Sequence, residues 1–297
     1  MTALPEDLLA YAARGPEWAA WLERLPRLVR ELLEEWSLAL DGAATHGRTA
    51  LVVPVRTTAG RPAVLKVGWP HPEAEHEALA LQHWRGRGAV RLLRADPHRW
   101  ALLLERLDPE GLVDLWDLDA CGIVAGLYRQ LHVPAPPQLR LLSVQAARWA
   151  DELAALSRDA PLPRRMVEHA RSLAEDFAAD AACDGTLIHA DLHFTNVLLD
   201  RADDTWRAIG PEPLSGDPHF ELAPMLWHRV EEYAGREREA VRDRFFAMVD
   251  AAGLDEDRAR DWVIVRMLVA IKDELLGNAA ADRAWVSMML TITKAVQ

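Results

Sequence analysis

The stretch from Thr186 to Pro218 constrains the chain more than any other, because polar residues at fixed spacing interrupt its apolar runs. It reads TLIHADLHFTNVLLDRADDTWRAIGPEPLSGDP, in which His189, Asp191 and Asn196 follow the pattern H-x-D-x-x-x-x-N. The run NVLL, the polar turn RADD and the run WRAI predict a β-hairpin. Folding this hairpin at its polar turn places Asn196 opposite Gly210.

The spacing of Asp191 and Asn196 is typical of a phosphotransfer loop, in which a base and a metal-binding amide lie five residues apart. Asp191 would accept the proton of a substrate hydroxyl, and Asn196 would bind Mg²⁺ through its side-chain oxygen. His189 would support the loop by hydrogen bonding. Such a loop also needs an Asp as second metal ligand, at the position where this chain has Gly210. The sequence therefore predicts a phosphotransfer site that lacks one carboxylate.

Length and charge limit the classes of partner. The 297 residues are enough for two domains, and the net charge of -12 argues against nucleic acid and anionic membranes as partners. A cationic substrate is compatible with this charge. The N-terminus lacks the features of a signal peptide, no apolar run approaches the roughly 18 residues of a membrane span, and two cysteines form no disulfide framework. We expect a cytoplasmic protein.

The first hundred residues predict a small antiparallel sheet with accompanying helices. Apolar residues at helical spacing indicate a helix from Pro16 to Trp36. Short apolar runs predict strands at residues 36–40, 50–56 and 62–67, a helix at 73–84, and further strands at 89–93 and 100–104. The loop from Gly42 to Gly47 could cover the phosphates of a nucleotide or be an ordinary hairpin turn.

Lys66 lies between apolar residues of a predicted strand, where a lysine is costly unless its amine reaches a partner or solvent. The helix that follows presents Glu73 and Glu77 one turn apart. A strand lysine paired with a helix glutamate is oriented onto phosphates in kinases, so we predict Glu77 as the partner and Glu73 as the alternative. Downstream, the backbone of Glu105 and Leu107 could bind the edge of an adenine, or it could simply end the strand.

From Leu112 onward the pattern is mostly helical. Helices are expected at residues 119–132, 142–157, 163–182, 220–233, 236–252, 256–276 and 282–296. Mixed elements followed by helices predict an α+β bilobal protein, with an N-lobe of residues 1–107 that binds the nucleotide and a helical C-lobe of residues 108–297. Lys66 and Asp191 are expected to converge on a triphosphate in a cleft between the lobes.

A different class of enzyme remains open at this point. His189, Asp191 and His193 alternate along the chain, and Asp217 and His219 follow nearby. On a strand the first three would share one face, and the set could bind zinc or another transition metal in a hydrolase. The phosphotransfer interpretation accounts in addition for the strand lysine, the acidic helix and the hairpin.

With these motifs the chain resembles the aminoglycoside phosphotransferases, most closely the streptomycin 6-phosphotransferase and hydroxyurea-type antibiotic-resistance kinases. The resemblance spans nearly the whole chain and rests on LVVPV, AVLK, GRGAVRLL, ALLLERLD, LHVPAPP, IHADLHFTNVLL and IGPEPLSGDPHFELAPML. It implies a protein-kinase-like fold with a small N-lobe sheet and a larger, mostly helical C-lobe. It also implies ATP, Mg²⁺ and transfer to a hydroxyl of a cationic antibiotic. By this resemblance Asp191 is the catalytic base, Asn196 a metal ligand and Lys66 the phosphate-contacting lysine.

The chain departs from the family pattern I-D-P-x-P-L, because it reads IGPEPL from Ile209. A residue before proline favours extended geometry, so the sequence gives no evident need for a left-handed turn at Gly210. Three interpretations are open. The chain could be a pseudo-kinase that binds nucleotide or antibiotic without efficient transfer, an active enzyme altered by a single change, or an enzyme in which Asp217 or Glu212 reaches the metal. We hypothesise that Gly210→Asp raises ATP-dependent transfer at least about a hundredfold.

The resemblance further suggests acidic residues that face a cationic drug. Candidates are Asp273 and Glu274 on a late helix, with Glu221 and Trp227 after the Gly-Asp-Pro turn. Each could equally be an ordinary residue of a helix surface.

Overall fold

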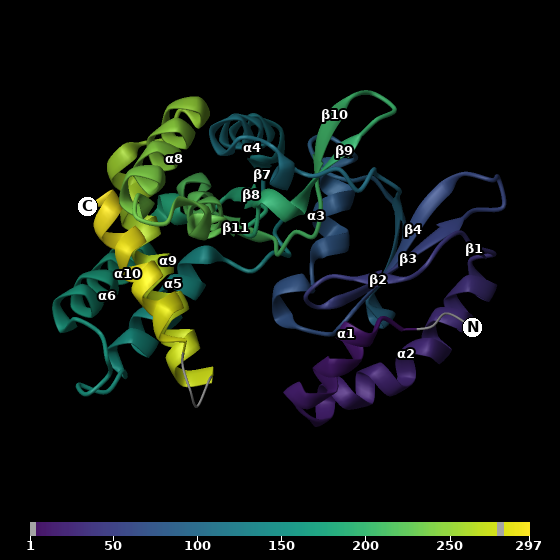
Figure 1. Cartoon of the computed structure of the whole chain (residues 1–297), viewed down its shortest axis with the longest axis horizontal. Coiled ribbons are helices and arrows are strands. Elements are labelled where there is room, and N and C mark those ends of the chain that lie inside the picture. Colours follow the sequence, from purple (N-terminus) through teal and green to yellow (C-terminus); the bar gives the residue numbers. More distant parts are fainter. Residues whose placement is uncertain (1–3, 278–281) are drawn as a thin grey trace. The chain divides into compact units, whose positions relative to one another are not determined.

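The structure, a computed structural model, describes residues 4–277 and 282–297. The chain forms two compact units (Figure 1). The first unit comprises the chain up to Asp108 together with Asp200–Asp203, and the second comprises Pro109–Leu199 and the chain from Asp204 onward. This division lies one residue beyond the boundary expected from the sequence, and the assignment of a separate function to each lobe stays a prediction.

The first unit is built on an antiparallel sheet in the order β1-β3-β4-β6-β5, with β2 paired to β3. Its strands are β1 (Ala39–Leu40), β2 (Thr45–His46), β3 (Ala50–Arg56), β4 (Pro62–Gly68), β5 (Leu92–Asp96) and β6 (Ala101–Glu105). Its helices are α1 (Glu6–Leu9), α2 (Pro16–Glu35) and α3 (Glu77–Trp84), with short 3₁₀ turns η1 (Ala10–Arg14), η2 (Pro72–Ala74) and η3 (Pro97–Arg99).

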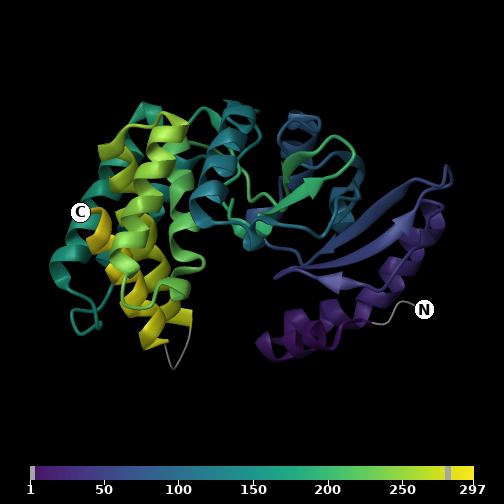
Figure 2. The ribbon, with the colours of Figure 1, turned by 45° about the horizontal axis from the view of Figure 1, so that its top comes forward.

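Alternation along β4 decides where Lys66 points. Successive strand residues face opposite sides of a sheet, and Ala63, Leu65 and Val67 are fully buried in one hydrophobic core. The apolar stripe of α2 supplies the other side of this core, and Figures 1 and 2 show α2 running along the sheet. Lys66 therefore projects from the opposite face of the sheet, away from α2.

The second unit is mostly helical. Its helices are α4 (Asp117–Leu131), α5 (Leu142–Ala154), α6 (Arg164–Ala179), α7 (Ala223–Trp227), α8 (Glu237–Ala252), α9 (Glu256–Gly277) and α10 (Arg283–Val296). Its strands are β7 (Val133–Pro134), β8 (Thr186–Ile188), β9 (Val197–Asp200), β10 (Thr205–Ala208) and β11 (Leu214–Gly216). Short 3₁₀ turns are η4 (Leu112–Asp114), η5 (Ala181–Cys183), η6 (Phe194–Asn196), η7 (Pro218–Leu222) and η8 (Val230–Tyr233).

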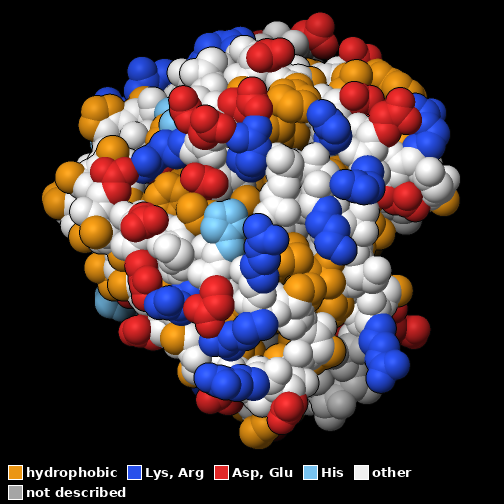
Figure 3. Space-filling model, turned by 90° about the vertical axis from the view of Figure 1, so that its left-hand side faces the viewer, with side chains coloured by type: hydrophobic (Ala, Val, Ile, Leu, Met, Phe, Trp, Pro, Cys, Tyr) orange, Lys and Arg blue, Asp and Glu red, His pale blue; other side chains and the backbone are white. Residues whose placement is uncertain are grey.

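Helix α9 is the centre of this unit. It contacts α5, α6, α7, α8 and α10, and its apolar residues from Trp262 to Leu268 are buried on every side. Strand β8 pairs with β7 and β11. It ends immediately before residues 189–196, which carry the H-x-D-x-x-x-x-N motif and are called the catalytic-type loop below. Strands β9 and β10 form the predicted hairpin. Figure 3 shows one face of the molecule, where Lys and Arg side chains are interspersed with Asp and Glu. Among residues 4–277 and 282–297, no helix has the length and apolar character needed to cross a bilayer.

The α+β organisation expected from the sequence agrees with these two units, but several element boundaries differ. The expected helix 73–84 begins only at Glu77, after the turn η2, and the strand expected at 89–93 is β5 at Leu92–Asp96. The expected helix 220–233 is divided into η7, α7 and η8. The division falls at Arg229, whose φ of 60° is incompatible with a continuing right-handed helix.

Candidate active site

Lys66 forms a close ion pair within the first unit. Its Nζ donates to both carboxylate oxygens of Glu77 at 2.6 and 2.8 Å. Glu77 is 5% exposed, and an unpaired buried carboxylate would be strongly destabilising. Glu73 instead lies 3.2 Å from the imidazole of His71. The structure thus pairs Lys66 with Glu77, the partner favoured from the sequence.

A small pocket lies beside this ion pair, within the first unit. Lys66 and Glu77 contribute to its lining together with Thr49, His71 and Trp100. The rings of His71 and Trp100 are stacked with centroids 6.5 Å apart. The pocket volume of about 30 Å³ gives room for one or two water molecules.

The expected adenine-binding segment follows β6. The backbone N–H of Glu105 donates to the carbonyl of Arg91 at 3.0 Å, and its carboxylate accepts from the Arg91 N–H at 2.7 Å. Glu105 could therefore offer a nucleotide only its backbone carbonyl. Leu107 lies two residues further on, outside the strand.

In the second unit, Asp191 and Asn196 are brought together by the loop after β8. The Asn196 Nδ2 donates to the backbone carbonyl of Asp191 at 2.8 Å and to its Oδ2 at 3.2 Å. Burial would raise the pKa of Asp191. The opposing effects are larger: the contact with His193, whose Nε2 lies 3.5 Å from Oδ2, and the charges of His189 and Arg266 hold this pKa below its usual value. Asp191 is therefore an ionised carboxylate in a fixed orientation.

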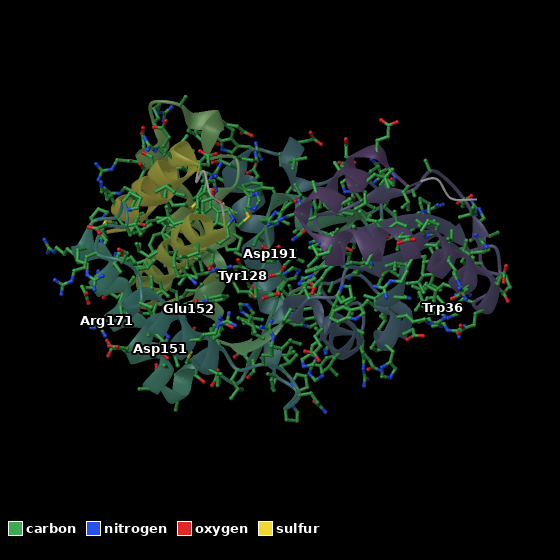
Figure 4. All side chains as sticks on the ribbon, turned by 90° about the horizontal axis from the view of Figure 1, so that it is seen from below. Trp36, Tyr128, Asp151, Glu152, Arg171 and Asp191 are labelled. Carbon is green, nitrogen blue, oxygen red and sulfur yellow. The ribbon has the colours of Figure 1, made fainter. Side chains whose placement is uncertain are left out.

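The residue before Asp191 is strained. Ala190 has a φ of 67°, in the left-handed region that costs a residue with a Cβ about 1–2 kcal/mol. Glu221, fully buried in η7, accepts the backbone N–H groups of His189 and Ala190, the latter at 3.1 Å. Tyr128, labelled near Asp191 in Figure 4, donates its hydroxyl to the Glu221 carbonyl at 2.9 Å. Glu221 was expected to face a substrate; that expectation is wrong, because its carboxylate is enclosed beneath the loop.

Arg266 is a loop-supporting residue that sequence reasoning missed. It donates to the carbonyls of Ala190 and Phe220, each at 3.2 Å, and burial lowers its pKa to about 10. Its guanidinium also lies over the rings of Phe220 and Trp227, at 4.1 and 4.9 Å from their centroids. A single arginine inside the apolar run VIVRMLVAI was the signal that could have identified it.

Gly210 lies opposite Asn196, as the hairpin predicts. The Ile209 N–H donates to the Asn196 carbonyl at 2.9 Å, and the buried His189 ring contacts the Ile209 carbonyl through Nε2 at 3.1 Å. Burial lowers the pKa of His189. Gly210 has a φ of +64°, so the extended geometry favoured before Pro211 is not adopted and the turn is left-handed.

The donor set around Asn196 fits a divalent cation only in part. A Cβ at Gly210 would lie 3.8 Å from the Asn196 Oδ1, but the glycine itself supplies no ligand. Asp217 is not available as a substitute, because His219, Arg258 and Trp262 already donate to its two oxygens. The expectation that Asp217 could reach the metal is therefore wrong, and Asn196 offers a single neutral oxygen.

The hydrolase alternative gains no support. In the described part of the chain, no three His, Cys, Asp or Glu side chains converge as ligands of one ion. The His193 ring stacks on His228 with centroids 3.9 Å apart, and the His219 Nδ1 pairs with Asp217 at 2.6 Å. These side chains are thus engaged in separate contacts.

The remaining substrate candidates differ in their surroundings. Asp273 is exposed and lies 2.7 Å from the Lys272 Nζ, while Glu274 accepts the backbone N–H of Asp282 at 2.9 Å. Trp227 ends α7 and is partly exposed against Arg266. Among the four candidates, Trp227 alone combines an exposed surface with a position next to a residue that supports the catalytic-type loop.

Comparison with known proteins agrees with this geometry. The sequence is 39% identical over 298 residues to a streptomycin 6-kinase of Streptomyces glaucescens, covering 97% of this chain and 96% of that protein. It is 41% identical over 275 residues to a hydroxyurea phosphotransferase of Kitasatospora aureofaciens, covering 89% of this chain and 78% of that protein. The crystal structure of the aminoglycoside phosphotransferase APH(4)-Ia matches with a TM-score of 0.63 at 19% identity, over 91% of this chain and 99% of that one. This likeness confirms the predicted protein-kinase-like fold.

A family of aminoglycoside/hydroxyurea antibiotic resistance kinases matches residues 35–273, a range that contains Lys66, Asp191, Asn196 and Gly210. The match covers most of the chain, and two relatives above 30% identity extend it over nearly the full length. The chain belongs to the aminoglycoside/hydroxyurea antibiotic resistance kinase family.

Proposed function

We propose that this protein is an ATP-dependent phosphotransferase that acts on a hydroxyl of an aminoglycoside-type antibiotic. The observation that carries the proposal is the state of the Asp191 carboxylate. Its Oδ2 is held by Asn196, whereas in the described residues no hydrogen-bond donor reaches its Oδ1. One ionised oxygen is thus left to accept a proton, which is what a hydroxyl nucleophile requires of a base.

In this proposal the substrate oxygen forms a bond to the γ-phosphorus of ATP as the bond from that phosphorus to the bridging oxygen breaks. The hydroxyl proton passes to the Asp191 Oδ1, and ADP leaves with the bridging oxygen. Asn196, Glu221 and Arg266 act as positioning residues, because they hold the loop that carries Asp191. Preorganisation of this kind supplies much of the rate in phosphoryl transfer.

Lys66 is assigned to the nucleotide phosphates. Its ion pair with Glu77 fixes a single cation at the end of a flexible stem, which reduces the entropy lost on binding. The Glu105 carbonyl and the Leu107 N–H are proposed to bind the adenine edge. A cytoplasmic site of action, where ATP is available, is part of the same proposal.

Mg²⁺ enters the proposal only as an ion carried by the nucleotide. The Asn196 Oδ1 is a suitable oxygen ligand, but Gly210 adds none and Asp217 is already saturated. Magnesium in nucleotide sites usually takes one or two carboxylates besides the phosphates. The residues present therefore do not complete the expected site, and no step above depends on the metal.

The substrate is proposed to be a small cation. The net charge of -12 favours approach of a cationic antibiotic, and Trp227, Asp273 and Glu274 stay candidates for contacting it. Relatives are named for two different substrates, streptomycin and hydroxyurea. Hydroxyurea is neutral, so a comparison of the two compounds tests whether charge selects the substrate.

The test is direct detection of the phosphorylated product. Purified protein is incubated with ATP, Mg²⁺ and streptomycin, hygromycin B or hydroxyurea, and the products are analysed by ³¹P NMR and mass spectrometry. We expect slow transfer to an aminoglycoside and at least about a hundredfold less with Asp191→Asn, a loss typical of a removed base. Transfer that is equal in the two proteins would refute the assignment of Asp191.

A second candidate function is favoured by Gly210 itself. A chain with this loop but without the acidic metal ligand could bind nucleotide or a small molecule and transfer phosphate poorly. Thermal-shift measurements separate the two candidates, because a ligand that binds only the folded state raises its melting temperature. Stabilisation by ATP with no phosphorylated product for any of the three compounds would favour the nucleotide-binding protein.

A further inference from the structure

Gly210 lacks a side chain, and we call the empty space beside its Cα the vacancy, although the backbone on both sides of it is held by hydrogen bonds. The backbone on either side is held by the Ile209 N–H on the Asn196 carbonyl and by the Glu212 N–H on the His189 carbonyl, at 2.9 and 3.0 Å. Neither bond involves a side chain at residue 210. The loop therefore keeps its course although the residue that should supply a carboxylate has none.

The vacancy has room for the missing group. The Asn196 Oδ1, 3.8 Å away, is the only heavy atom of the described residues, chain neighbours apart, within 4 Å of an ideal Cβ at Gly210. Two oxygens on adjacent corners of a Mg²⁺ octahedron lie about 3 Å apart, a separation that a carboxylate on this Cβ could reach. Asp and Asn are the residues other than glycine that best tolerate a left-handed φ.

The nearby carboxylates do not replace it. Asp217 receives hydrogen bonds from His219, Arg258 and Trp262. Glu212 interacts electrostatically with Arg266 and helps to balance that buried cation. Among the described residues, the side chain nearest to a Cβ at position 210 is thus the neutral amide of Asn196.

We propose that nucleotide binding by this chain has become independent of divalent metal, and that the single change Gly210→Asp restores the dependence. The inference rests on the proposed function, since it assumes that Lys66 binds the phosphates. With Lys66 as the cation and no carboxylate at position 210, free ATP is bound at least as well as its Mg²⁺ complex. A carboxylate at position 210 would repel the free triphosphate and hold the metal-bound one.

The experiment compares the affinity for ATP in excess EDTA and in Mg²⁺, by isothermal titration calorimetry. For the natural chain we expect an affinity in EDTA equal to or higher than that in Mg²⁺. For Gly210→Asp we expect Mg²⁺ to strengthen binding by about tenfold or more relative to EDTA. Gly210→Asn is the matched control, because it has nearly the same size and tolerance of the left-handed turn but no charge; it should behave as the natural chain does.

The outcomes are separable. A natural chain that requires Mg²⁺ for binding would overturn the inference and leave the proposed function standing. An equal Mg²⁺ preference in the Asp and Asn variants would also overturn it, because charge would then play no part. Absence of ATP binding in both buffers, for all three proteins, would overturn the proposed function and the inference with it. The measurement on the natural chain tests the first part of the proposal, that nucleotide binding does not depend on divalent metal, even where a variant fails to fold.

Discussion

The buried carboxylate of Glu221 offers the sharpest test of how the catalytic-type loop is held. It accepts the N–H groups of His189 and Ala190 and is fully enclosed. Glu221→Leu leaves two buried N–H groups without an acceptor, at about 1–3 kcal/mol each, so we expect a loss of roughly 2–6 kcal/mol in unfolding free energy. Glu221→Gln keeps an acceptor oxygen and loses only the charge assistance, about 1–2 kcal/mol.

The assay is amide hydrogen exchange on a peptide containing His189 and Ala190, supported by urea unfolding followed by circular dichroism. Glu168→Gln on the exposed surface of α6 is the control and should lie within about 0.5 kcal/mol of the natural chain. Unchanged protection of both amides in Glu221→Leu would refute the reasoning, because the carboxylate would then not hold the loop.

The dependence of this contribution on pH follows from the pKa of Glu221. Burial would raise it, but the contact with His132, the charge of His189 and the N–H of Ala190 lower it below the ordinary 4.5. A carboxyl whose folded pKa is depressed contributes stability above its unfolded pKa and loses it as pH falls through the folded pKa. The stability difference between the natural chain and Glu221→Gln should therefore shrink below about pH 4.5.

Three further predictions follow from single residues. Ala190→Gly should raise the unfolding free energy by about 0.5–1 kcal/mol, measured by thermal melting, because relief of a left-handed φ outweighs the greater chain entropy of glycine; a lower melting temperature would contradict this. Burial would raise the pKa of Asp217, but His219 and Trp262 lower it, so Asp217→Asn should cost about 3–5 kcal/mol in urea unfolding at neutral pH and less on acidification. Lys66→Met should abolish the ATP-induced rise in melting temperature, and a full shift would show that the phosphates bind elsewhere.

The sequence predicted those parts of the fold whose pattern is local. Alternation in β3 and β4 and the run VIVRMLVAI in α9 each identify an element from its own residues. The break after α7 could not be predicted in this way. The Arg244 guanidinium, from α8, donates to the carbonyls of His228 and Arg229 at 2.7 and 3.4 Å and pairs with Asp117 of α4 at 2.9 Å. Arg244 thus supplies hydrogen bonds to backbone carbonyls that would be bonded within the helix if the helix were unbroken. No local sequence pattern predicts this tertiary contact.

In the candidate site, too, local patterns predicted some contacts, whereas a tertiary contact decided another. The motif placed Asp191 and Asn196 in contact, and the strand pattern with the acidic helix selected Glu77 for Lys66. Glu221 was misassigned to the substrate because a glutamate in a predicted helix carries no sign of which side it faces. Its position is fixed by the need of two loop N–H groups for an acceptor, which becomes visible only when the loop has a conformation.

That conformation explains why a change at residue 210 can remove a ligand and spare the loop. The strained φ of Ala190 is held by Glu221 from one side and by Arg266 from the other, and the turn at Gly210 is tied to Asn196 through the backbone of Ile209. Strain persists only where the surroundings fix it in several independent ways. Since none of these ties uses a side chain at residue 210, the position of the Asp191 carboxylate and the supply of the metal ligand are physically separate, and each can be changed without the other.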